Sequence, residues 1–151
     1  MESKLKRFLI GLFVTLFGAN SSAQVNQDAW KEDPAETIVG IHLISDYGSE
    51  HTILSTEISR EIIDKELEKL DWNNNFYQFA VVVSPGVSME VGGSLNGIDG
   101  LSAMYRDRNN RVDAVIKRPP ETVKQMQEIL ESFISENGNW QQLYDFEFTN
   151  Y

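Results

Sequence analysis

Apolar and polar residues alternate along the middle of the chain with the two-residue period of β-strands. Segment 76–84 is almost wholly apolar and predicts a central strand. In segments 87–93, 101–107 and 112–117 the apolar residues fall at every second position, which predicts strands with one buried face. Turn sequences separate these four segments, so we expect them to form an antiparallel meander.

Three further segments extend the strand pattern. Residues 37–45 are β-branched and apolar, and predict a strand. Residues 52–55 form either a short second strand or the run into a helix. In the tail, 144–148, aromatic side chains alternate with acids, which predicts a final edge strand with an aromatic face.

Two stretches have the three- and four-residue spacing of amphipathic helices. The first is 55–72, in which Ser55 or Thr56 is expected to cap the first amides. The second begins at the two prolines 119–120, which suit a first helical turn, and Gly138 is expected at its C-terminal end.

These elements predict a single α+β domain over residues 37–151. We expect an antiparallel sheet of about five to six strands with two helices packed on one face. The preceding stretch, 24–36, is polar apart from one Trp and one Pro, and is expected to be a flexible arm.

Residues 1–23 have the organisation of a signal peptide. Basic residues precede the apolar run 8–19, which is shorter than the roughly 20 residues of a membrane span. Ser21 and Ala23 suit a signal peptidase, with cleavage after Ala23. An uncleaved membrane anchor is the alternative. We therefore expect a periplasmic or secreted protein with no stable membrane insertion after processing.

Removing the leader leaves 10 Lys and Arg against 22 Asp and Glu, a formal charge of −12, because it takes away three bases and one acid. Such a surface repels nucleic acid and favours a basic protein partner, although negative charge also simply keeps a small protein soluble. The absence of Cys excludes disulfides, thiol nucleophiles and thiolate metal sites. The domain must therefore depend on its apolar core.

Candidates for catalysis and metal binding are few. His42 lies in a strand pattern and His51 in a turn, without metal-motif spacing, which indicates a bonded core His42 and a solvated His51. Glu90 precedes the glycine-rich segment 92–100 and Asp99 lies near its end, and the two would form an acid–base pair if they converged. That segment lacks the lysine of a phosphate-binding loop and is interpreted as a flexible connection. We predict no catalytic residue, no metal site and no cofactor.

Aromatic residues gather near the C-terminus with acids among them. Nucleic-acid sites place cationic side chains beside stacking aromatics, so this pattern instead favours a protein-binding face, with core packing as the alternative. In such a face aromatic residues pack against the partner and carboxylates meet Lys or Arg. The candidate contact residues are Asp99, Tyr144, Asp145, Glu147 and Tyr151.

The stretch 89–146, MEVGGSLNGIDGLSAMYRDRNNRVDAVIKRPPETVKQMQEILESFISENGNWQQLYDF, resembles small immunity-type proteins encoded beside bacterial polymorphic or contact-dependent toxins. The resemblance consists of a strand with paired glycines, an exposed DGLSAMY strand, a hairpin and a helix that ends near Trp140. It implies neutralisation of a toxin by tight binding without catalysis, and assigns no role to individual residues. With a signal peptide, it would further imply a toxin that acts in the periplasm.

The sequence therefore predicts a periplasmic protein-binding or inhibitor protein, an immunity protein by resemblance, and not an enzyme. Two alternatives stay open. One is a small exported hydrolase that uses carboxylates and His42, and the other is an envelope domain without catalytic function. A deep cleft in which His42 converges with an acid would favour the hydrolase.

Overall fold

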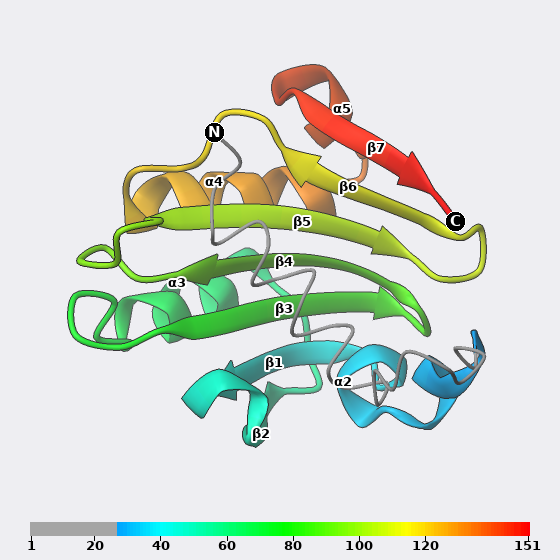
Figure 1. Ribbon diagram of the computed structural model, residues 1–151, viewed down its shortest axis with the longest axis horizontal. Coiled ribbons are helices and arrows are strands. Elements are labelled where there is room, and N and C mark those ends of the chain that lie inside the picture. Colours follow the sequence, from blue (N-terminus) through cyan, green and yellow to red (C-terminus); the bar gives the residue numbers. More distant parts are fainter. Residues whose placement is uncertain (1–26) are drawn as a thin grey trace.

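The computed structural model describes residues 27–151, which contain one antiparallel sheet of seven strands in the order β2-β1-β3-β4-β5-β6-β7 (Figure 1). The strands are β1 (Gly40–Ser45), β2 (Glu50–Ser55), β3 (Tyr77–Ser84), β4 (Val87–Gly93), β5 (Leu101–Asp107), β6 (Val112–Ile116) and β7 (Phe146–Asn150). The predicted α+β class is confirmed. The predicted number of five to six strands is wrong, because both short candidate segments form full strands at the sheet edges. The predicted signal peptide, 1–23, and residues 24–26 of the predicted arm lie outside the described residues.

Two longer helices, α3 (Arg60–Glu68) and α4 (Val123–Ile134), lie on the same side of the sheet (Figure 1). Every second residue of each strand points to that side. One apolar cluster includes buried side chains of the strands and of both helices, among them Ile41, Phe79, Val81, Met89, Val91, Ala103, Ile63, Leu67, Met126, Ile129 and Leu130. The main core therefore lies between the helices and one face of the sheet.

Helix α3 begins later than the apolar pattern predicts. Residues 50–55 continue as strand β2, and the hydroxyl of Ser59 accepts the capping hydrogen bond from an amide in the first turn at 3.2 Å. The predicted caps, Ser55 and Thr56, therefore lie before the helix. The hydroxyl of Ser55 instead accepts a hydrogen bond from the amide of Glu57 at 3.0 Å, within the turn that leads to the helix.

Helix α4 also begins later than predicted. The hydroxyl of Thr122 accepts the capping bond at 3.1 Å, so the prolines 119–120 precede the helix and do not form its first turn. Gly138 has a positive φ of 52°, as expected of a turn glycine, but the helix already ends at Ile134. The capping hydroxyl thus decides where the periodic pattern becomes helical.

The stretch interpreted as an arm contains two short helices, η1 (Ala29–Glu32) and α2 (Pro34–Thr37). Trp30 is buried, and its ring packs directly on Gly86 in the turn between β3 and β4. The amide of Gly86 donates a hydrogen bond to the carbonyl of Glu36 at 2.8 Å. These contacts fix the start of the described chain against the sheet.

Two more short helices complete the elements: η2 (Asp46–Gly48) between β1 and β2, and α5 (Trp140–Leu143) before β7. In the β5–β6 hairpin the residue with positive φ is Arg111, at 55°, and neither of the two asparagines before it. Among residues 27–151, none of the helices has the length and apolar character needed to cross a membrane.

We predict that Gly86→Ala destabilises the domain more than Gly100→Ala. Both glycines have positive φ, of 81° and 65°, and each alanine should therefore cost about 1 kcal/mol in backbone strain. A methyl group on Gly86 would also lie 2.8–2.9 Å from the Trp30 ring, whereas none of the atoms around Gly100 lies within 4 Å. Overpacking should add about 1–3 kcal/mol for Gly86→Ala, measurable by urea unfolding. Equal losses in the two variants would show that Trp30 does not hold this turn.

Candidate functional site: a buried ion network on the second face of the sheet

The face of the sheet opposite α3 and α4 carries charged side chains that are buried. The strand register aligns Glu90 with Met104 and Ser88 with Arg106, and Arg106 in turn pairs with Asp113. Glu90 and Arg106 are only 4% and 7% exposed. Charged groups are rarely buried without partners, and buried charges gather at functional sites, which makes this face the candidate site.

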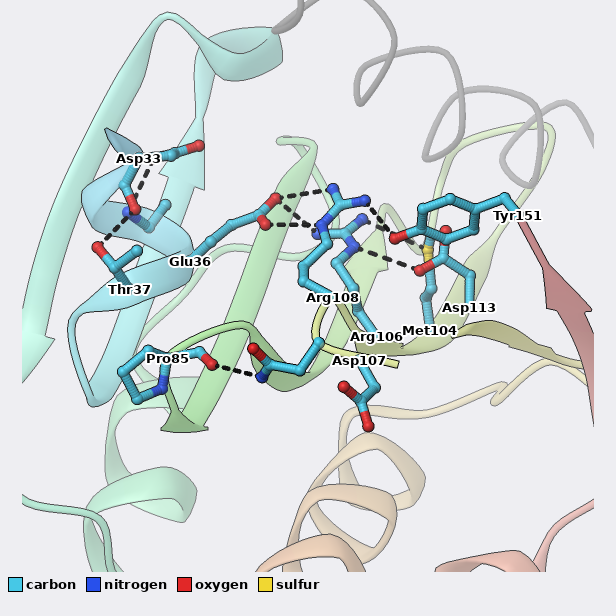
Figure 2. A network of polar contacts seen from close by, with 12 residues as sticks. Asp33, Glu36, Thr37, Pro85, Met104, Arg106, Asp107, Arg108, Asp113 and Tyr151 are labelled. Atoms are coloured by element: carbon cyan, nitrogen blue, oxygen red, sulfur yellow. Dashed lines mark hydrogen bonds and ion pairs between the residues drawn. The ribbon is translucent and has the colours of Figure 1, made fainter. Parts of the chain in front are cut away.

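Glu36 lies at the centre of an ion network on this face (Figure 2). Arg108 donates from Nε to Oε2 at 2.8 Å and from Nη2 to Oε1 at 3.1 Å, and Arg106 donates from Nη1 to Oε1 at 3.4 Å. All three side chains are less than one-tenth exposed. The bidentate bond from Arg108 is the strongest arrangement available to this pair. One carboxylate from α2 therefore holds two guanidinium groups from β5 and the turn after it.

The network extends to β6 and to the C-terminus. Arg108 donates from Nη1 to the hydroxyl of Tyr151 at 2.8 Å, and its guanidinium carbon lies 5.9 Å from the centre of that ring. On the other side, Nε of Arg106 lies 3.8 Å from Oδ1 of Asp113 (Figure 2). Segments separated by more than 100 residues of chain thus meet in one set of polar contacts.

Among the described residues, the buried acids of this network outnumber its buried bases. Burial raises the pKa of Glu36, and the guanidinium groups of Arg106 and Arg108 oppose that rise. Burial likewise raises the pKa of Asp113, again against the two arginines. With Glu90 included, three carboxyl groups face two guanidinium groups.

Glu90 has few hydrogen bonds for a buried carboxyl group. Its Oε1 atom accepts one long hydrogen bond from Nε2 of Gln78, at 3.4 Å, and its Oε2 atom has no hydrogen-bond partner among the described residues. Burial raises the pKa of Glu90, while the nearby Arg106 lowers it and Glu36 raises it further. A central strand therefore carries a carboxyl group that favours its neutral form.

The two histidines form a bonded pair at the edge of the same face. Nε2 of His42 donates to the carbonyl of Ile38 at 2.7 Å, and its Nδ1 lies 2.8 Å from Nε2 of His51. The rings stack with their centres 5.1 Å apart. His42 is fully buried, and burial lowers its pKa, with a smaller lowering effect from His51. His42 is therefore neutral near pH 7, and both of its ring nitrogens are engaged.

The geometry around His42 does not favour the alternative of a hydrolase that uses this residue. Because both nitrogens of His42 are bonded within the protein, neither is free to take a proton from an attacking water. Glu90 lies inside β4, whereas Asp99 lies in the loop beyond the end of that strand, so the structure does not bring these two acids together. Within residues 27–151 no three His, Asp or Glu side chains are grouped so as to hold a metal ion.

Four of the five predicted contact residues gather on or beside β7. Tyr144 and Asp145 immediately precede the strand, Glu147 lies within it, and Tyr151 follows it. Asp145 pairs with Lys117 at 3.4 Å, at a well-exposed position. Asp99 is separate from them, in the loop between β4 and β5.

Glu36, Arg106 and Arg108 are not among the residues predicted from the sequence. Glu36 lies in the polar stretch 24–36, which has no periodic pattern that would indicate a buried side chain. A signal for Arg106 did exist: if Leu101, Ala103 and Tyr105 point to the core, Arg106 must point to the opposite face. Glu90 satisfies the same rule on β4, so a charged row on the second face could have been predicted.

We predict that Arg108→Ala lowers the free energy of unfolding by about 3–5 kcal/mol at pH 7, because it leaves the buried carboxylate of Glu36 with one distant partner. The matched control is Lys117→Ala, which breaks an exposed pair and should cost less than about 1 kcal/mol. Adding Glu36→Gln to Arg108→Ala should restore part of the stability in urea unfolding. A loss for Arg108→Ala no larger than that for Lys117→Ala would contradict the role given to the network.

We predict that Glu90→Gln stabilises the domain at neutral and higher pH. The folded protein raises the pKa of Glu90 above the ordinary value of 4.5, so the folded state binds the proton more tightly than the unfolded chain. The contribution of Glu90 to the free energy of unfolding should therefore be greatest below pH 4.5 and should fall as the pH rises through the folded pKa. Glutamine does not titrate, so the variant should not show this loss. Unfolding at about pH 4 and about pH 8 checks this. A variant less stable than wild type at the higher pH would overturn the assignment.

Comparison of the chain with protein-family models, with curated proteins and with solved structures finds no match. The site therefore has to be interpreted from its own chemistry. That chemistry consists of paired ions, engaged histidines and exposed acids.

Proposed function

We propose that the domain is an exported, non-catalytic binding protein that inhibits a basic protein partner. The observation that carries this proposal is the concentration of negative charge on the helical side of the molecule. Residues 57–71 and 121–136, which contain α3 and α4, hold 10 Asp and Glu against four Lys and Arg. This excess of six acids is half of the formal charge of −12 that residues 24–151 carry.

Two of these acids lie against each other on neighbouring helices. Burial raises the pKa of Glu131 on α4, and Asp64 on α3 adds to the rise through a hydrogen bond and through repulsion between the two carboxyl groups. Arg60 opposes the rise, with its Nε 2.9 Å from Oε1 of Glu131. A close pair of carboxyl groups favours either a shared proton or an added cation. A lysine or arginine of a partner would relieve the same repulsion.

Tyr144 connects the predicted contact residues with this acidic side. Burial raises the pKa of its hydroxyl, and the charges of Glu128 and Glu131 raise it further, which means that both acids lie near the phenol. An aromatic ring beside carboxylates suits a lysine or arginine side chain, through cation–π contact and ion pairing together. The acidic surface of α3 and α4 and the ring of Tyr144 are therefore the proposed recognition features.

The immunity role is the specific form of the proposal. It follows from the resemblance of residues 89–146 to toxin-neutralising proteins and from the predicted signal peptide. A protein exported in this way would meet its partner in the periplasm or outside the cell. The proposed partner is a basic toxin, held by surface complementarity and steered by charge.

We predict that the immobilised mature domain captures a basic protein from the exported fraction of its host, identified by mass spectrometry. The double variant Glu128→Gln, Glu131→Gln should weaken that complex about tenfold at low salt, with a smaller difference at high salt, because screening removes the charge contribution. The affinities are measured by isothermal titration calorimetry.

A matched control is Glu32→Gln, Glu50→Gln, which removes the same two charges from exposed positions on η1 and β2. It should change the affinity no more than about threefold, since only long-range attraction is reduced. If both double variants weakened the affinity for the partner equally, the helical side would not be the recognition surface. Failure of the wild-type domain to bind any basic exported protein would remove the proposed function itself.

A further inference from the structure

Strand β7 is an open edge of the sheet. Among residues 27–151 it pairs only with β6, and it is the last strand in the sheet order. The amide of Tyr151 donates to the carbonyl of Arg111, and the carbonyl of Asp145 accepts from Lys117, so the odd-numbered residues of β7 bond to β6. In an antiparallel ladder the residues between them direct their amide and carbonyl groups the other way. Phe146, Phe148 and Asn150 therefore present their backbone groups to the outer edge.

The side chains of β7 differ between its two faces. Phe148 lies on the helical side, where it stacks on Trp140 with ring centres 6.2 Å apart, and it remains 47% exposed. Glu147 pairs with Val115, and so lies on the opposite face, where the ion network is. Asp145, two residues earlier, shares that face and is exposed. The edge thus offers an apolar surface on one side and two acids on the other.

We propose that β7 accepts an extended segment of the basic partner as an eighth strand of the sheet. The segment fitted to this edge alternates apolar residues, which pack beside Phe148, with lysine or arginine residues beside Asp145 and Glu147. Its backbone bonds to the outward amide and carbonyl groups of Phe148 and Asn150. This inference deepens the proposed function and depends on it, because it specifies how part of the partner is held.

Charge determines which occupant fits. A second copy of the domain carries the same formal charge of −12, so two copies repel each other as they approach. A basic segment is attracted by the same charge. The opposite edge, β2, is less suitable as a template, because its pairing with β1 shifts register between Ile41 and His42, and such irregularities bend an edge strand.

The test uses the mature domain and a synthetic peptide in which lysine and valine alternate over about eight residues, with a glutamate–valine peptide as its control. Amide hydrogen exchange is followed by NMR. We expect the lysine–valine peptide to slow the exchange of the Phe148 and Asn150 amides at least about tenfold, while the glutamate–valine peptide leaves them unchanged. Unchanged exchange at both amides with saturating lysine–valine peptide would overturn the inference.

Two variants separate the backbone from the ring. Phe148→Pro removes an outward amide without removing a bond to β6, and Phe148→Ala removes the ring but keeps the amide. We expect Phe148→Pro to weaken peptide binding at least about tenfold, and Phe148→Ala to weaken it less. Circular dichroism and unfolding confirm that each variant is folded, and Asn150→Pro serves in place of Phe148→Pro if that variant is not.

The outcomes distinguish this inference from the proposed function. The captured basic protein could bind the Phe148→Pro variant as tightly as wild type, and bind the double variant Glu128→Gln, Glu131→Gln more weakly. In that case the proposal of strand addition at β7 is wrong and the proposed function stands. If sedimentation shows that β7 pairs with a second copy, and Phe148→Pro abolishes that dimer, the occupant proposed here is wrong. If no basic partner exists, both proposals fall.

Discussion

The arrangement of the second sheet face depends on the ion pairs that the carboxylate of Glu36 forms with Arg106 and Arg108. This carboxylate accepts three hydrogen bonds from the two arginines, and the backbone carbonyl of Glu36 accepts the amide of Gly86. Arg108 then holds the hydroxyl of Tyr151. A single short helix near the start of the domain is therefore connected to the middle of the sheet and to the end of the chain. Removing one charge from such a buried set leaves the others uncompensated, which makes the contacts interdependent.

The two faces of the sheet are stabilised by different physical effects. On the helical side apolar burial dominates, and residues such as Val81 and Met89 are wholly removed from solvent. On the second side buried ions lie beside a smaller apolar cluster of Met104 and Val115, and the desolvation of those ions offsets much of their attraction. Buried ion pairs add less to stability than an apolar core does, but they form only when their partners are held in one arrangement. Here that arrangement aligns β5 and β6 and fixes the residue that follows β7.

The candidate recognition surfaces are separate from the ion network but are connected to it. The acids of α3 and α4 lie on the helical side, and Tyr144 lies beside two of them. Strand β7 lies between Tyr144, which precedes it, and Tyr151, which follows it and is held by Arg108. The network thus holds the end of the chain next to the edge strand, and Phe148 on that strand is 47% exposed. In the proposed arrangement the buried ions position the candidate binding surface and do not themselves contact the partner.

The sequence by itself determined the strands of the meander, because the alternation in 87–93, 101–107 and 112–117 is a local pattern that requires a buried face. It also determined the charge, the absence of thiols and the grouping of candidate contact residues near the C-terminus. Only the tertiary structure decided which acids and bases meet. Glu36 lies in a stretch with no periodic pattern, and its partners are about 70 residues away in the chain. Long-range pairing depends on the strand register and on the docking of Trp30, neither of which a local pattern contains.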